Sequence, residues 1–127
     1  MPGGKRSELG RFGEERAASY LEGKGYQILA RNVRNWAGEV DLVARDGGTT
    51  VFVEVRTRRG RSLGTPEESI TREKARRLVR VAQAYLQDRG ALERDWRVDV
   101  VALELDGGRV SLRHHVSAVT EGGGHAL

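Results

Sequence analysis

The stretch from Gly38 to Arg58, GEVDLVARDGGTTVFVEVRTR, constrains the fold of this chain more than any other. Two segments of alternating apolar residues flank Gly47-Gly48, a pattern that indicates a β-hairpin with a two-residue loop. Counting outward from that loop places Asp41 opposite Glu54. Opposed residues have β-carbons about 5 Å apart, and like charges at that distance are destabilising. The hairpin therefore predicts two neighbouring carboxylates whose repulsion something must offset.

A bound cation, a shared proton or nearby arginine could offset this repulsion. Two carboxylates at this spacing suit a hard divalent ion such as Mg²⁺, whose remaining ligands would be water, backbone carbonyl and phosphate oxygens. The same register places Glu39 across from Arg56, which predicts an ordinary cross-strand ion pair. The spacing alone leaves both the metal site and the ion-pair network open.

The rest of the chain predicts an α/β domain with a mixed central sheet flanked by helices. Apolar periodicity and turn residues give the order helix, three strands, helix, two strands. The expected elements are a helix over 7–24, strands over 26–33 and within 38–58, a helix over 71–90, and strands over 96–105 and 109–116.

Each predicted helix carries one polar residue at the edge of its apolar side. In the first, Glu14 precedes Ala17 by three residues and so faces inward, whereas Glu15 faces solvent. In the second, Thr71 can act as the N-cap, with Ile70 and Ala75 forming a hydrophobic staple across it. Lys74 lies at the margin of the apolar stripe of that helix.

Length and composition exclude several classes of protein. The 127 residues predict a single domain, with flexible tails at 1–6 and 120–127. The sequence has no cysteine, which rules out disulfides and thiolate metal ligands and fits a reducing compartment. It has no apolar run of membrane-spanning length and no signal-peptide core, so we expect a cytoplasmic protein without a membrane partner. The motifs GxxxxGK[ST], GxSxG and HExxH do not occur.

Basic residues cluster more than the net charge of +4 suggests. The segments RTRRGR and REKARRLVR lie on either side of a loop and predict contacts with nucleic-acid phosphates, although a solvated arginine-rich surface is the alternative. The residues expected to bind nucleic acid are Arg58, Arg59, Arg61, Arg72 and Arg76. Two tryptophans, Trp36 and Trp96, could stack on bases or pack at the rim of the core.

Two further groups of polar residues have less specific interpretations. Asp99, among valines in a predicted strand, predicts either a contact that supports the acid pair or an ion pair with Arg97. Adjacent His114 and His115 on a strand point to opposite faces, and His125 lies in the tail, so we expect no histidine metal site.

Four segments, GRFGEERAASYLEGKGYQILARN, GEVDLVARDGGTTVFVEVRTR, REKARRL and WRVDVVAL, resemble the YraN family of bacterial nuclease-like proteins. The resemblance runs from Gly10 to about Val119. Members of this family look like archaeal Holliday-junction resolvases in the PD-(D/E)xK restriction-endonuclease-like superfamily, which implies an αβββαβ core. The superfamily fingerprint is an acid on one strand, acid-x-lysine on the next, and often a helical glutamate. It implies that Asp41, Glu54 and Glu14 hold Mg²⁺ or Mn²⁺.

Arg56 departs from this fingerprint, which has lysine at its position. A buried lysine can lose its proton and help to activate water, whereas arginine stays protonated and offers a rigid fork of donors. Arg56 could clamp the scissile phosphate, or it could close the metal position by pairing with Glu54 or Glu39. Lys74 is the nearest lysine that could substitute. The expected catalytic residues are Asp41, Glu54, Arg56, Glu14 and Lys74.

The resemblance therefore implies a metal-dependent endonuclease that hydrolyses phosphodiester bonds in DNA, including branched or structured DNA. Resolvase-like relatives are often dimers, because a two-fold substrate suits two active sites, so a homodimer is the expected assembly. Two alternatives stay open: a non-catalytic nucleic-acid-binding module on the same fold, and a partner-binding or structural domain whose acids belong to ion-pair networks.

Overall fold

The computed structural model describes residues 7–121, 124 and 127. It confirms the predicted α/β class and the predicted order of elements. These are α1 (Glu8–Gly23), β1 (Gln27–Asn35), β2 (Gly38–Asp46), β3 (Thr49–Arg59), the 3-10 turn η1 (Glu67–Ser69), α2 (Arg72–Asp88), β4 (Trp96–Asp106) and β5 (Arg109–Val119). The predicted tail 1–6, and residues 122–123 and 125–126 of the other predicted tail, lie outside the described residues; they include His125. No helix in the described part of the chain is long and apolar enough to cross a membrane.

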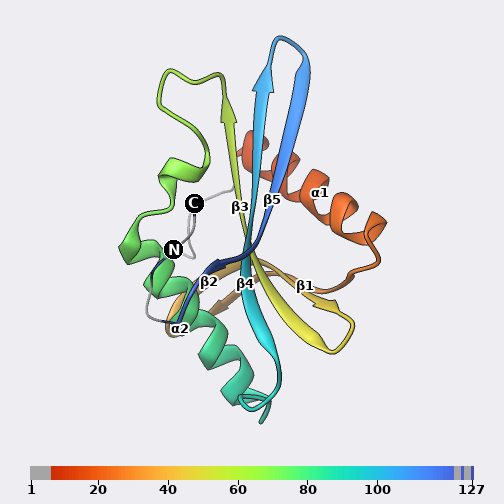
Figure 1. Cartoon of the computed structure of the whole chain (residues 1–127), viewed down its shortest axis with the longest axis vertical. Helices are drawn as coiled ribbons and strands as arrows, with labels where there is room; N and C mark the ends of the chain where they lie inside the picture. The colour runs from red at the N-terminus through yellow and green to blue at the C-terminus, as the bar shows by residue number, and fades with distance from the viewer. Residues whose placement is uncertain (1–6, 122–123, 125–126) are drawn as a thin grey trace.

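A five-stranded mixed sheet in the order β1-β2-β3-β4-β5 divides the molecule. Neighbouring strands are antiparallel except β3 and β4, which are parallel and are connected through α2. Figure 1 shows α1 and α2 on opposite sides of this sheet. The two helices therefore bury both faces of the central strands.

Alternation along β3 divides the apolar core into two layers. Phe52 lies in the cluster that packs against α2, while Val51 and Val53 lie in the cluster that packs against α1. Leu78 of α2 belongs to the first of these clusters, and Leu21 of α1 belongs to the second. Successive side chains of β3 therefore belong to opposite faces of the sheet.

The β2–β3 hairpin has the predicted register over only part of its length. Asp46 pairs with Thr49 across a two-residue loop, and the ladder ends at the pair Leu42–Val53. Asp41 and Glu54 would be the next pair, so they lie where the two strands separate.

The predicted cross-strand pair of Glu39 with Arg56 is wrong. Beyond the end of its ladder with β3, β2 continues its pairing with β1, where Glu39 lies opposite Arg34. The Glu39 carboxylate accepts a hydrogen bond from Arg34 Nη2 at 3.1 Å. Arg56 pairs instead with Glu54 on its own strand, with 2.6 Å between Nη2 and Oε2.

Both helices begin at side-chain caps. Ser7 Oγ accepts a hydrogen bond from the Gly10 N–H at 2.9 Å, and Thr71 Oγ1 accepts one from the Lys74 N–H at 3.1 Å. Ile70 and Ala75, on either side of the second cap, are both buried in the core. The predicted start of the second helix is therefore confirmed.

A glycine sets the distance between α1 and β3. A β-carbon at Gly13 would overlap Thr57 Oγ1 and lie 3.1 Å from Thr57 Cβ. Only a residue without a side chain lets α1 pack this closely on β3. The next residue, Glu14, is thereby brought close to β3.

We expect Gly13→Ala to lower the free energy of unfolding by about 1–3 kcal/mol, because the added methyl group must push α1 away from β3. Gly23→Ala is the matched control: no atom lies within 4 Å of a β-carbon at Gly23, so alanine there should be neutral or stabilise α1 by up to about 1 kcal/mol. Urea unfolding measures both. Equal effects of the two substitutions would show that Gly13 does not set this contact.

Candidate functional site

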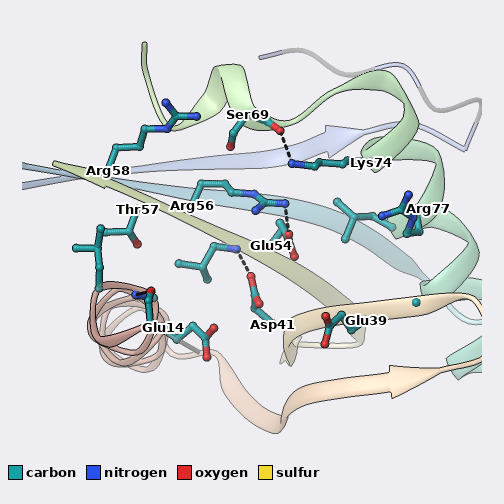
Figure 2. Close-up of a pocket in the computed structure, with 16 residues that line it drawn as sticks. Glu14, Glu39, Asp41, Glu54, Arg56, Thr57, Arg58, Ser69, Lys74 and Arg77 are labelled. Atoms are coloured by element: carbon teal, nitrogen blue, oxygen red, sulfur yellow. Dashed lines mark hydrogen bonds and ion pairs between the residues drawn. The ribbon is translucent and has the colours of Figure 1, made fainter. Parts of the chain in front are cut away.

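A cavity of about 670 Å³ opens where β2 and β3 separate, and we call it the β2–β3 cleft. It is lined by Ser7, Leu9, Gly10 and Glu14, by Gly38, Glu39 and Asp41, by residues 54–58, and by Ser69, Lys74, Arg77 and Leu78. All five predicted catalytic residues are in this lining (Figure 2). The fold thus brings together residues from α1, β2, β3 and α2 that are far apart in the sequence.

Asp41 completes the hydrogen bonding at the end of the hairpin ladder. Its Oδ2 accepts a hydrogen bond from the Val55 N–H at 2.7 Å (Figure 2). The backbone of β2 no longer pairs with β3 at this point, so the carboxylate supplies the acceptor that a neighbouring strand would have provided. Asp41 is therefore fixed in place by the backbone of β3.

Glu54 is buried beside this carboxylate. Burial raises the pKa of Glu54 well above its usual range, and the charge of Asp41 and a hydrogen bond shared with it raise that pKa further. The Arg56 guanidinium opposes these effects. Asp41 and Glu54 thus lie close together, as predicted. Their mutual repulsion favours the binding of a proton or a cation at this site.

Arg56 carries an unused hydrogen-bond donor. Its Nη2 contacts Glu54 Oε2 at 2.6 Å, whereas its Nε is buried and has no hydrogen-bond partner in the described part of the chain. An unsatisfied buried N–H of a charged group is unfavourable. Arg56 also lines the β2–β3 cleft, where its guanidinium suits an anionic ligand such as a phosphate.

Positive side chains from α2 and β3 form another wall of the cleft. Lys74 Nζ donates a hydrogen bond to the Ser69 carbonyl at 3.2 Å (Figure 2). Arg77 Nη2 lies 3.2 Å from Glu73 Oε1. Arg58 also lines the cleft, and its Nη1 donates to the Leu63 carbonyl at 2.5 Å. Carboxylates and cations therefore face the same cavity.

Glu14 reaches the cleft from α1, which lies on the other face of the sheet (Figure 2). The neighbouring Glu15 has 69% of its side chain exposed and pairs with Arg31 at 2.9 Å. The predicted inward and outward orientations of these two glutamates are confirmed.

Sequence reasoning did not assign five polar residues of the lining to the site: Ser7, Glu39, Thr57, Ser69 and Arg77. Two of them had a usable signal. Arg77 follows Lys74 by three residues on a helix, and Glu39 precedes Asp41 by two on a strand, so each shares a face with a predicted residue. Ser69 comes from the irregular segment before α2, whose position no periodicity predicts.

The other arginines predicted to bind nucleic acid lie outside the cleft. Arg61 bonds Glu104 through Nε at 2.7 Å and through Nη2 at 3.0 Å. Arg59, Arg72 and Arg76 are exposed, and none of them forms an ion pair with a described residue. Of the five arginines predicted to bind nucleic acid, only Arg58 lines the same cavity as Asp41 and Glu54.

A network of ion pairs holds the segment that leads from β3 to α2. Arg113 of β5 bonds Glu67 of η1 through Nε at 2.6 Å and Nη2 at 2.8 Å, and it also bonds Glu104 at 2.9 Å. His115 Nε2 lies 2.8 Å from Glu67 Oε2. The hydrogen bonds from Arg113 lower the pKa of Glu67 to about 2. This network fixes the backbone that carries Ser69 at the cleft.

Asp99 and His114 belong to the α1 side of the sheet. Asp99 accepts hydrogen bonds from Arg97 Nε at 3.0 Å and the Ser117 N–H at 2.9 Å, and its Oδ2 lies 2.8 Å from His114 Nε2. Burial opposes ionisation of Asp99, but hydrogen bonds from His114, Ser117 and Arg97 outweigh it and lower the pKa. The predicted ion pair with Arg97 is confirmed. His114 and His115 point to opposite faces, as predicted.

The two tryptophans have different surroundings. Trp96 is half-buried and packs edge-to-face against Phe52, with 6.2 Å between ring centroids. Trp36 is 80% exposed in the turn between β1 and β2. Of the two alternatives, packing at the rim of the core therefore applies to Trp96.

The donors in the cleft suit a hard divalent cation. Among the described residues, no three acidic or histidine side chains form a group that could hold a metal ion by themselves. Mg²⁺ commonly uses one or two carboxylates and completes its octahedron with water and phosphate oxygens. Asp41 and Glu54 fit this mode of binding.

Fold and site together define an α/β protein with a cleft of carboxylates and cations where a mixed sheet opens. The chain belongs to the family described as "Uncharacterised protein family UPF0102", which matches residues 13–103, and this confirms the predicted YraN family membership. It is 51% identical over 124 residues to the UPF0102 protein of Chloroflexus aurantiacus, covering 95% of this chain and 99% of the relative. The UPF0102 protein of Roseiflexus castenholzii is 48% identical over 121 residues (93% and 98%), and that of Symbiobacterium thermophilum 53% over 96 residues (76% and 81%).

We expect Glu54→Gln to stabilise the protein at neutral pH. The folded-state pKa of Glu54 is raised, so its favourable contribution is complete below the usual value of 4.5 and is lost as the pH rises through the folded-state pKa. Each tenfold change in an acid dissociation constant on folding corresponds to about 1.4 kcal/mol of stability. Glutamine does not ionise, so the stability difference should grow from near zero at about pH 4 toward neutrality.

Urea unfolding at a series of pH values measures this difference. Glu15→Gln is the matched control, because an exposed ion pair contributes at most about 1 kcal/mol. A difference between wild type and Glu54→Gln that does not change with pH would contradict this explanation.

Proposed function

We propose that the protein is a metal-dependent nuclease that hydrolyses phosphodiester bonds in DNA. One observation carries the proposal: in a cavity of about 670 Å³, two adjacent carboxylates lie beside an arginine whose buried Nε has no partner among the described residues. The carboxylates suit a divalent cation, and the guanidinium of Arg56, which lines the same cavity, suits a phosphate. A phosphodiester bound with a metal ion would use both.

Each residue of the cleft has a role in this proposal. Asp41 and Glu54 would bind Mg²⁺ or Mn²⁺ directly, and Glu14 would contact the ion through water. The bound ion supplies an acidified water molecule and offsets negative charge in the transition state. Arg56 would hold the scissile phosphate and stabilise the charge that develops on its oxygens. Lys74 would provide a further positive charge beside the attacked phosphate.

A stripe of arginines along α2 supports DNA as the substrate. Arg72, Arg76 and Arg80 follow one another at intervals of four residues, and all three are exposed. None of them forms an ion pair with an acidic residue that the structure describes. Like charges at this spacing destabilise a helix by about 0.2–0.5 kcal/mol per pair. A polyanion would turn this repulsion into attraction through phosphate contacts.

The resemblance to PD-(D/E)xK enzymes and Holliday-junction resolvases extends the proposal to branched or structured DNA. A homodimer would present two clefts to a two-fold symmetric substrate. Such a substrate would place the protein in the cytoplasm.

A non-catalytic nucleic-acid-binding module is the second candidate, and the Arg56–Glu54 contact of 2.6 Å favours it. An arginine paired with Glu54 occupies part of the space where a cation would bind. Nucleic-acid binding by such a module would be independent of metal and strongly dependent on salt.

We expect Asp41→Asn and Glu54→Gln each to abolish cleavage of DNA junctions and flaps in Mn²⁺ and to remove the heat of Mn²⁺ binding in isothermal titration. The physical reason is that an amide replaces an anionic ligand. Glu15→Gln, next to Glu14 but facing solvent, should leave both unchanged. Cleavage that survives both substitutions would exclude this site as the source of activity.

Arg56→Lys separates the two candidates. If Arg56 holds the scissile phosphate, lysine keeps the charge but loses the fork of donors, and cleavage should fall by about 100-fold or more. Arg31→Lys, which changes an exposed arginine paired with Glu15, is the control. A rise in cleavage would instead show that Arg56 closes the metal position and would favour the binding module.

A further inference from the structure

Trp36 is held in an exposed position that the packing of the fold does not use. Its exposed fraction is 80%, which is exceptional for a large aromatic side chain. It lies in the two-residue turn between β1 and β2. An indole presented in this way is available to a ligand.

The turn that carries Trp36 is anchored to α2 at two points. Asn35 Oδ1 accepts a hydrogen bond from the Ala37 N–H at 3.0 Å, while Asn35 Nδ2 donates to the Val81 carbonyl at 3.1 Å. Gly38 has a φ of 143°, and its β-carbon position lies only 3.1 Å from Arg77 Cδ. The backbone on both sides of Trp36 is therefore fixed, so little conformational entropy would be lost when a ligand covers the ring.

Trp36 is close to the β2–β3 cleft. Gly38 and Glu39 line that cleft, and Trp36 precedes Gly38 by two residues, which span at most about 7 Å of chain. Nucleotides in a stacked strand advance about 3.4 Å each. The backbone of Trp36 therefore lies within about two nucleotide spacings of Gly38, at the edge of the cleft.

Three arginines lie near this turn; Arg34 pairs with Glu39 and Arg77 with Glu73, whereas no ion pair with a described residue holds Arg80. Arg77 packs against Gly38 and also lines the cleft, exposed Arg80 directly precedes the Val81 that bonds Asn35, and the Arg34 side chain is 47% exposed. Arginines around an exposed aromatic ring are the combination that binds single-stranded nucleic acid, with phosphates on the cations and a base on the ring.

We propose that Trp36 is a platform on which an unpaired base stacks, next to the phosphate held in the cleft. In a continuous duplex each base face is covered by its neighbours, so a side chain stacks most readily on a base that is unpaired or turned out of the helix. The substrate class is therefore DNA with an unpaired strand beside the cleavage position. This inference rests on the proposed function, whose substrate it narrows.

Fluorescence of Trp36 tests the proposal without cleavage. In a Trp96→Phe background, with EDTA present, titration with a short oligothymidylate should quench the remaining indole, whereas a blunt duplex of matched length should quench it far less. Absence of quenching by the single strand would overturn the proposal. So would emission that changes with protein concentration alone, because a second copy of the chain would then cover Trp36.

Affinity measurements on proteins that keep Trp96 provide a second readout. Trp36→Ala should weaken binding of the oligothymidylate on the order of tenfold, and Trp36→Phe should retain most of the affinity. Leu92→Ala removes another exposed apolar side chain, beyond the far end of α2, and should have no effect. Equal affinities of wild type and Trp36→Ala for the single strand would overturn the platform.

The two proposals fail in different ways. If wild type binds and is quenched by the single strand but cleaves no DNA with Mn²⁺, the nuclease fails and the platform stands. If it cleaves DNA and Trp36→Ala changes neither binding nor the choice between duplex and unpaired strands, the platform fails and the nuclease stands.

Discussion

The end of the β2–β3 ladder at Leu42–Val53 is the constraint on which the rest of this structure depends. A strand that leaves its neighbour exposes backbone N–H and C=O groups that need other partners. Here the Asp41 carboxylate accepts the Val55 N–H, so the opening between the strands is stabilised by a residue that also faces the cavity. The same opening gives Glu14 on α1 access to residues on the other face of the sheet. One backbone divergence thus creates the cavity and determines which side chains line it.

The hairpin register was predictable because it depends on local rules. Two glycines specify a two-residue loop, and a period of two then assigns every side chain to a face, including the buried Glu54. The point at which the ladder stops was not predictable, because beyond Leu42 β2 continues along β1 alone, which the hairpin pattern does not specify. The predicted Glu39–Arg56 pair failed for this reason: it assumed that the strands stay together. Ser69 was missed because ion pairs between η1 and β5, far apart in the sequence, set its position.

Among the described residues, like charges lie close together at Asp41 and Glu54 and along the arginine stripe of α2. Asp99, fully buried on the α1 side, has three hydrogen-bond partners that keep it ionised, and Glu67 is similarly held by Arg113 and His115. Glu54 and the arginine stripe of α2 lack such complete compensation. Polar groups that serve only the fold are generally satisfied within it, whereas groups that await a ligand are not. This contrast separates the β2–β3 cleft from the ion-pair networks around it.

The pairing of Arg56 with Glu54 on the same strand has a consequence for folding. Contacts between residues close in sequence form at a lower entropic cost than contacts between distant ones, so a hairpin with a two-residue loop can assemble before the parallel β3–β4 pair, which must wait for the crossover through α2. The nascent hairpin already contains the cation that partly offsets its two acids. This partial compensation of charge is therefore internal to the hairpin and does not depend on elements that dock later.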